Sequence, residues 1–211
     1  MLILILAVVV SLSIGVLTGG KVSNLAQTRF RYLPLLIVAL MVQILIFSEL
    51  FGREPIIHRI GPYIHIATLA TSFGVMVMNR HIPGMKIIMI GAGLNLLVIT
   101  ANGGFMPISE SALRIAGQEE EMVHHTPRHD SEDYLLPNSR LSAGKANLLF
   151  LGDAIPFREG WPIATVVSIG DLILAAGAGT AVILGMRRRD SEDEEDESTL
   201  VLHESNHTPA H

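Results

Sequence analysis

Hydrophobic residues dominate five stretches of the chain, and polar and charged residues fall between them. The stretches cover approximately residues 2–18, 33–51, 60–79, 84–101 and 162–186. At about 1.5 Å per helical residue, stretches of this length approach the roughly 30 Å of a bilayer's hydrocarbon core. Lipid offers no hydrogen-bond partner to open backbone groups, so such segments must be helical. The pattern predicts an all-α integral membrane bundle of five transmembrane helices.

The composition agrees with this prediction. The chain is 49% hydrophobic and only 17% charged, and its mean hydropathy is +0.45, which is more apolar than an ordinary soluble domain. It contains no cysteine, which excludes disulfide and thiolate chemistry. No charge precedes the first stretch, and Thr18-Gly19-Gly20 is a poor cleavage site, so we expect a retained span rather than a cleaved signal peptide. Residues 1–187 are expected to form one membrane domain.

Basic residues near the ends of the stretches predict the orientation, because such residues mark the cytoplasmic side. With five spans, one side of the membrane collects Lys21, Arg29, Arg31, Arg80, Lys86, Arg187, Arg188 and Arg189. The opposite side carries Arg53 and Arg59, which are offset by Glu49 and Glu54. We therefore expect a multi-pass protein of the cell membrane, with its N-terminus extracytoplasmic and its C-terminus cytoplasmic.

Two polar regions lie outside the stretches. Residues 102–160 form an unusually long connection, expected to be extracytoplasmic. Within it, 109–117 is predicted to be a short helix capped by a serine and ended by a glycine, and 118–140 lacks apolar periodicity and is expected to be mobile. The tail, 188–211, is a run of acids followed by polar residues, and is predicted to be disordered in the cytoplasm.

Three short motifs stand at the ends of the last two stretches. They are Asn102-Gly103-Gly104-Phe105-Met106-Pro107, Leu151-Gly152-Asp153-Ala154-Ile155-Pro156 and Ser168-Ile169-Gly170-Asp171. Together with the five-stretch pattern, they resemble an uncharacterised family of bacterial membrane proteins, DUF5317. The likeness covers roughly residues 1–187 and excludes the acidic tail. The resemblance implies an integral membrane protein without an assigned activity, and it supplies no catalytic residue.

Asp171 is the strongest candidate for chemistry. It lies about nine residues into the last stretch, hence near the middle of the membrane. A charge there costs several kcal/mol unless it is paired, protonated or hydrated. Ser168 shares its helix face, and Asn95 is the expected partner because it shares a face with Gly84 and Gly91, where glycine permits close helix approach. The residue either locks helices together or lines a polar cavity, to which His65 of the third stretch would contribute.

The remaining candidates belong to the long connection. Asn102, Gly103 and Gly104 are expected to end a helix with left-handed glycine, with an anion-binding turn as the alternative. Asp153 is a turn residue, or a second carboxylate if its loop folds over Asp171.

Metal donors cluster in the middle of the same connection, at His124, His125, His129 and Asp130. Because this segment lacks the rigid support that a metal site needs, we predict no bound metal there. We predict no cofactor either.

Three classes of function remain. The favoured one is a membrane scaffold or accessory protein, whose outer loop or acidic tail meets protein partners. The second is a small transporter with Asp171, Asn95 and His65 around a midplane site, and the third is an intramembrane enzyme that uses Asp153 and Asp171. No phosphate-binding glycine loop, zinc-protease helix or serine elbow is present, so a non-enzyme is favoured. The expected partners are the lipid bilayer and proteins rather than nucleic acid, and the sequence leaves the oligomeric state open.

Overall fold

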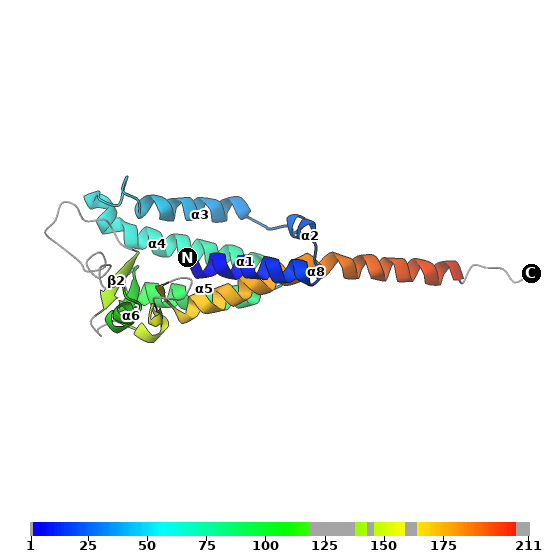
Figure 1. Cartoon of the computed structure of the whole chain (residues 1–211). Helices are drawn as coiled ribbons and strands as arrows, with labels where there is room; N and C mark the ends of the chain where they lie inside the picture. Colours follow the sequence, from blue (N-terminus) through cyan, green and yellow to red (C-terminus); the bar gives the residue numbers. More distant parts are fainter. Residues whose placement is uncertain (1, 119–137, 143–145, 159–163, 206–211) are drawn as a thin grey trace, which may run out of the picture.

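The computed structural model describes residues 2–118, 138–142, 146–158 and 164–205, with only the backbone for residue 2 and for 188–205. Long helices run side by side, and a small cap of short strands and one helix covers one end of the bundle (Figure 1). The long helices are α1 (Leu2–Leu17), α3 (Leu33–Ile46), α4 (Pro55–Met78), α5 (Met85–Ala101) and α8 (Ile169–Ser205). The shorter elements are α2 (Val22–Ala26), β1 (Met106–Ser109), α6 (Glu110–Ile115), β2 (Ser139–Ser142), the 3-10 helix η1 (Leu149–Leu151), β3 (Ile155–Phe157) and β4 (Thr165–Val167).

Helix α8 lies between two other long helices. It packs against both α1 and α5, whereas α4 packs against α5 and α3, so that α3 lies outermost (Figure 1). The α5–α8 contact is close because glycines face each other across it. A Cβ atom added to Gly91 would lie 2.7 Å from the backbone nitrogen of Leu174, and one added to Gly177 would lie 2.6 Å from that of Ile88. These distances leave no room for a side chain, so glycine is what brings the two backbones together.

The first helix is also held within the bundle by small residues. A Cβ added to Gly179 of α8 would lie 2.6 Å from the hydroxyl of Ser11, and Gly15 lies against the side chain of Met186. These small residues of α1 and α8 therefore serve contacts within one chain.

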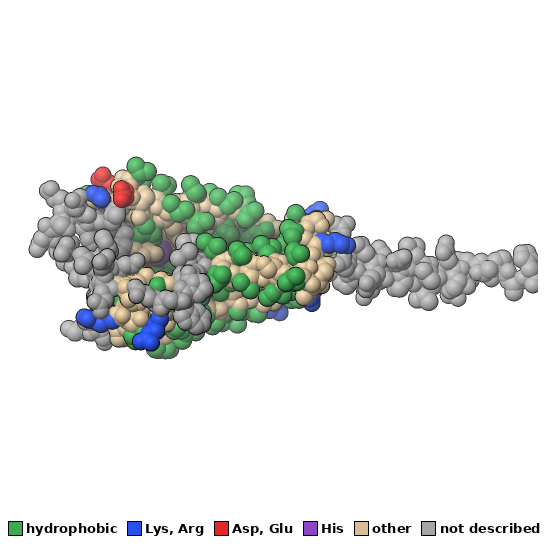
Figure 2. Space-filling view, viewed as in Figure 1, with side chains coloured by type: hydrophobic (Ala, Val, Ile, Leu, Met, Phe, Trp, Pro, Cys, Tyr) green, Lys and Arg blue, Asp and Glu red, His purple; other side chains and the backbone are tan. Residues whose placement is uncertain are grey.

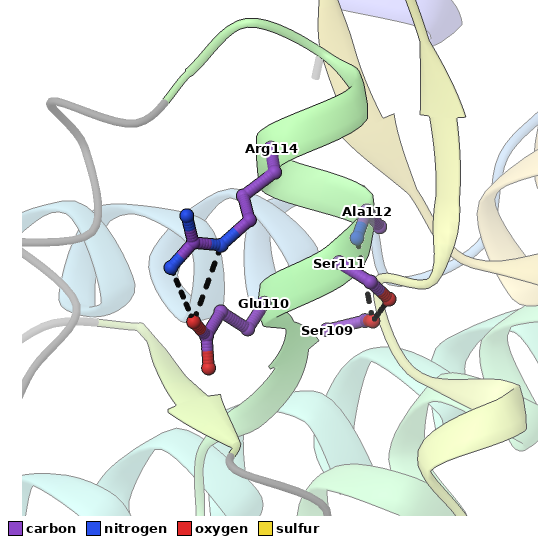
Figure 3. Close-up of polar contacts among 5 residues, drawn as sticks. All are labelled: Ser109, Glu110, Ser111, Ala112 and Arg114. Carbon is purple, nitrogen blue, oxygen red and sulfur yellow. Dashed lines mark hydrogen bonds and ion pairs between the residues drawn. The ribbon is translucent and has the colours of Figure 1, made fainter.

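The cap is built from the ends of the long connection. Strand β1 pairs in parallel with β2, and β3 pairs antiparallel with β4. The predicted helix at 109–117 is present as α6: the Ser109 hydroxyl accepts a hydrogen bond from the backbone nitrogen of Ala112 at 3.4 Å, and Gly117 follows with φ +74°. Figure 3 shows the Ser109 hydrogen bond at the start of α6 together with the ion pair between Glu110 and Arg114 on the same helix.

Two helix boundaries differ from the prediction because of proline and turn residues. The predicted span 33–51 ends as a helix at Ile46. The predicted span 60–79 begins earlier, at Pro55, a residue type that suits the first helical position. Pro62, a residue type that is usually found at helix ends, lies buried inside α4. Gly104 packs directly against it, and a Cβ atom added to Gly104 would lie 2.6 Å from the Cβ of Pro62.

The last predicted span begins later than expected. Residues 162–186 were predicted as one helix, but α8 begins at Ile169 and residues 165–167 form strand β4. The three residues of β4 are Thr and Val, whose branched side chains favour a strand, and they pair with β3. The sequence alone does not reveal that pairing.

The acidic tail also differs from the prediction. We expected 188–211 to be disordered, but α8 continues as a helix to Ser205. Extending an existing helix needs no new nucleus, and Glu and Arg are good helix formers. Residues 206–211, and residues 119–137 of the segment expected to be mobile, lie outside the described residues.

Helix length and composition favour membrane association for two helices. Pro55–Met78 and the Ile169–Arg187 part of α8 are long and apolar enough to cross a membrane, whereas Ile3–Leu17, Leu33–Ile46 and Met85–Ala101 are apolar but shorter. By this measure five transmembrane helices are not supported. The difference follows from the turns that shorten α3 and from the breaks that limit α1 and α5.

Candidate functional site

The motif Ser168-Ile169-Gly170-Asp171 forms the start of α8. The Ser168 hydroxyl accepts a hydrogen bond from the backbone nitrogen of Asp171 at 3.0 Å. In return, the backbone nitrogen of Ser168 donates to Asp171 Oδ2 at 3.3 Å. This reciprocal arrangement is a capping box with aspartate in the position usually taken by glutamate. It corrects the sequence interpretation: Asp171 lies in the first turn of α8 rather than at its middle, where a helix N-terminus favours a carboxylate.

Asn95 of α5 joins the same residues from the neighbouring helix. Its Nδ2 donates to Asp171 Oδ1 at 2.8 Å, and its Oδ1 accepts from the Ser168 hydroxyl at 3.0 Å. Gly170 makes room for the amide, since its missing Cβ would occupy the position of the Asn95 side chain. We call these three residues, Asn95, Ser168 and Asp171, the α5–α8 network. Ser168 is fully buried, so the network joins the two helices inside the bundle.

The motif that begins at Asn102 ends α5 and starts the cap. Gly103 and Gly104 have φ angles of +68° and +94°, values that favour glycine, as expected for a helix end. The Asn102 side chain also forms hydrogen bonds with the backbone of Asn147, which lies far along the long connection. Its Nδ2 donates to the carbonyl of Asn147 at 2.8 Å, and its Oδ1 accepts from the Asn147 backbone nitrogen at 2.9 Å. The motif thus anchors the cap to the bundle.

His65 belongs to a separate polar group on α3 and α4. Its Nδ1 lies 2.8 Å from the carbonyl oxygen of Gly104, so this nitrogen carries the hydrogen. The ring packs edge-on against Phe47, with 4.9 Å between ring centroids. Gln43 Nε2 donates to the Thr68 hydroxyl at 3.1 Å, and that hydroxyl donates to the backbone carbonyl of His65 at 2.8 Å. His65 therefore joins α3, α4 and the α5 end, rather than the α5–α8 network with which the sequence grouped it.

Asp153 is held by the first motif. Its backbone nitrogen donates to the carbonyl of Pro107, and its carbonyl accepts from the backbone nitrogen of Ser109, both at 2.9 Å. The preceding Gly152 packs against Pro107. Burial raises the pKa of the Asp153 carboxyl to about 7, and the nearby charge of Asp171 contributes to the rise. The two carboxylates that the sequence grouped together thus interact through space at the base of the cap.

Several structural polar residues were not identified from the sequence. Asn79 is fully buried, and its side chain brackets Arg31: Oδ1 accepts from the Arg31 backbone nitrogen at 2.7 Å, and Nδ2 donates to the Arg31 carbonyl at 2.8 Å. Asn24 Nδ2 donates to the carbonyl of Met186 at 2.8 Å. In the cap, the Arg140 guanidinium carbon lies 3.3 Å from the ring centre of Phe105. An asparagine as the last residue of the predicted stretch 60–79 was the available signal for Asn79.

The described residues include no group of three His, Asp or Glu that could hold a metal ion. The donors singled out from the sequence, His124, His125, His129 and Asp130, lie outside the described part of the chain.

Comparison with known proteins identifies the family. The profile of a family described as "Family of unknown function (DUF5317)" matches residues 27–183, which include all three motifs. An uncharacterized protein of Thermotoga maritima is 25% identical over 178 residues, which is 84% of this chain and 89% of that protein. No solved structure matches. The chain therefore belongs to the DUF5317 family, whose function is unknown.

Proposed function

We propose that this protein is an integral membrane scaffold, with α1, α3, α4, α5 and α8 in the bilayer and the cap on its extracytoplasmic face. The proposal rests on one observation: large hydrophobic side chains face outward between two charged ends of the bundle (Figure 2). The end of α8 beyond Arg187 would project into the cytoplasm, as the basic residues near the helix ends favour.

The large apolar side chains exposed on the long helices support this placement. Val9 of α1 is 53% exposed, Ile37 of α3 is 50% exposed and Ile90 of α5 is 58% exposed. Soluble monomers rarely expose contiguous apolar patches beyond a few hundred Å². The charged residues of the long helices, such as Lys86 and Arg187, lie near helix ends. An apolar belt between charged ends is the arrangement that a bilayer requires.

The shorter helices need help from their flanks to reach across a bilayer. At about 1.5 Å per residue, the 14 residues of α3 span about 21 Å, less than the roughly 30 Å of hydrocarbon. The turn after α3 supplies further apolar groups, among them Leu50, which is 78% exposed, and Phe51, which is 46% exposed. Local thinning of the bilayer accommodates a remaining mismatch at modest cost.

A scaffold is favoured over a transporter because the buried polar groups bond to one another. In the α5–α8 network, both oxygens of Asp171, both ends of the Asn95 amide and the Ser168 hydroxyl are engaged within the protein. The His65 group is engaged in the same way, but with other helices. The α5–α8 network and the His65 group thus connect different helices at two separate places, which supports a structural role. A midplane transport site with Asp171, Asn95 and His65 remains the alternative that this separation disfavours.

A second candidate function has one observation in its favour. The pKa of Asp153 is raised to about 7 by burial and by Asp171, and a carboxyl group with a pKa near neutrality is suited to general acid-base work. This supports carboxylate-dependent chemistry at the base of the cap as the alternative to a scaffold.

Cysteine labelling tests the proposed placement, because the chain has no cysteine of its own. Ser111 of the cap and Ser23 of α2 are both exposed, so Ser111→Cys and Ser23→Cys place a thiol at each end of the bundle. In intact cells, a membrane-impermeant maleimide should label the Ser111→Cys variant. The Ser23→Cys variant should react only after permeabilisation. The reverse pattern would overturn the orientation, and release of the protein from membranes by alkaline carbonate would overturn membrane integration.

A proximity-labelling experiment separates a scaffold from the alternatives. With the labelling enzyme fused after Arg189, a scaffold should reproducibly enrich the same membrane proteins in the wild type and in the Asp153→Asn variant. A partner set no different from that of an unrelated membrane protein would count against the scaffold.

A further inference from the structure

The described acidic side chains gather at one end of the bundle. Every acidic side chain that the structure describes lies towards the cap: Glu49, Glu54, Glu110, Asp153 and Asp171. The opposite end carries six exposed basic residues, which we call the inner rim: Lys21, Arg29, Arg31, Arg80, Lys86 and Arg187. Figure 2 shows basic side chains around this end of the hydrophobic surface. Among the side chains that the structure describes, no acid lies at this end beside Arg29, Arg31 and Arg80, so their positive charge favours an anionic partner.

One part of the inner rim is fixed in place by a buried side chain. The fully buried Asn79 bonds to both the backbone nitrogen and the carbonyl of Arg31. This clamp holds the segment before α3 against the end of α4, where Arg80 follows Asn79 in the chain. Arg29 lies two residues before Arg31 on the same segment. Arg31 and Arg80 therefore lie where the start of α3 meets the end of α4, and Arg29 is close to Arg31 in the sequence.

The neighbouring chain has the character of a membrane-interface segment. Helix α2 lies across the end of the bundle between α1 and α3 (Figure 1), where Asn24 bonds to the carbonyl of Met186. Tyr32, at the start of α3, is 61% exposed, and Val22 is 54% exposed. Tyrosine favours the headgroup level of a bilayer, where its ring is half in and half out of the apolar layer. Basic and apolar side chains exposed together on one short segment suit the surface of an anionic membrane.

We propose that the inner rim binds the phosphate groups of anionic phospholipids in the cytoplasmic leaflet, with Arg29, Arg31 and Arg80 as the main contacts. This inference rests on the proposed membrane integration. Guanidinium groups bind phosphate oxygens through paired hydrogen bonds. Beyond Arg187, the helix backbone of α8 continues away from the bundle (Figure 1).

Lipid binding to the full-length protein in neutral detergent tests this proposal. Fluorescent phosphatidylglycerol is titrated onto the protein, and fluorescent phosphatidylcholine is titrated in parallel. Phosphatidylglycerol should bind more tightly, and its affinity should fall as salt screens the charges. Replacing Arg29, Arg31 and Arg80 by glutamine should weaken phosphatidylglycerol binding by roughly fivefold per residue. Arg59→Gln, near the opposite end of α4 and also exposed, should leave the affinity unchanged.

Each alternative outcome has a clear meaning. Equal affinity for the two lipids, or a triple variant that binds as the wild type does, would overturn the proposal. Displacement of the lipid by equimolar glycerol phosphate would also overturn it, because the ligand would then be a soluble phosphate. If the triple variant does not fold, the single Arg80→Gln variant and the salt dependence of the wild type test the proposal instead. Phosphatidylglycerol binding that neither Arg80→Gln nor salt weakens would overturn it. Carbonate extraction distinguishes failure of the lipid-binding proposal from failure of the proposed membrane integration. A protein that stays in the membrane but shows no preference for phosphatidylglycerol contradicts only the lipid-binding proposal.

Discussion

Replacing Asp153 by asparagine should change how the stability of the protein depends on pH. The substitution keeps the shape of the side chain and removes its ionisation. The backbone hydrogen bonds that hold Asp153 to Pro107 and Ser109 involve only main-chain atoms, so they persist in the variant. The variant therefore tests the ionisation of this half-buried carboxyl without removing the backbone hydrogen bonds around it.

The expected magnitude follows from the pKa of this carboxyl. Burial, and secondly the charge of Asp171, raise it from 3.8 to about 7. Between these two values the folded protein keeps a proton that the unfolded chain has released, so stability falls as pH rises through this window. Each pKa unit corresponds to about 1.36 kcal/mol. The free energy of unfolding should thus fall by about 4 kcal/mol between about pH 4 and pH 8.

Thermal unfolding in a neutral detergent, followed by the helical circular dichroism signal, measures this dependence. The melting temperature of the wild type should fall across the window, and that of Asp153→Asn should stay nearly level. The variant should therefore be the more stable protein at the alkaline end of the window. Asp171→Asn should weaken the pH dependence in part, because it removes the second cause of the raised pKa of Asp153.

Glu110→Gln is the matched control, since Glu110 is also in the cap but forms an exposed ion pair with Arg114. Such pairs contribute little to stability, so this variant should follow the wild-type profile. The reasoning is refuted if Asp153→Asn retains the full pH dependence of the wild type, because the carboxyl would then not be the group that titrates.

Three further predictions concern the bundle. Gly91→Val should lower the free energy of unfolding by about 1–3 kcal/mol, because its Cβ would lie 2.7 Å from the α8 backbone. Gly74→Ala is the control and should not lower it, because Gly74 has open space around it. Equal melting temperatures for the two variants would contradict the close packing of α5 and α8. Asn95→Leu should cost about 1–3 kcal/mol by leaving its buried partners unsatisfied, and a wild-type melting temperature for this variant would argue against the α5–α8 network. Truncation after Arg189 should leave the membrane yield unchanged, since the apolar part of α8 ends before it, and a large fall in yield would show that the acidic extension is needed for insertion.

Local sequence accounts for much of the bundle. Runs of apolar residues predicted the long helices, and the ends of α1 and α5 fall within about one residue of the expected positions. The shared face of Gly84, Gly91 and Asn95 is the face that meets α8, because helical periodicity alone decides which residues share a face. The Ser109 cap and the glycine after α6 were likewise readable, since capping depends on residues within one helical turn.

Tertiary contacts decided the remainder. Strand β4 replaces the expected first turns of the last helix because β3 lies beside it, and this shift moves Asp171 from mid-helix into a capping box. Pro62, inside α4, packs against Gly104, which is far along the chain and has no side chain to occupy that space. His65 bonds to that same Gly104 rather than to Asp171. Which polar groups meet depends on how separate segments pack, and periodicity within one segment carries no information about that packing.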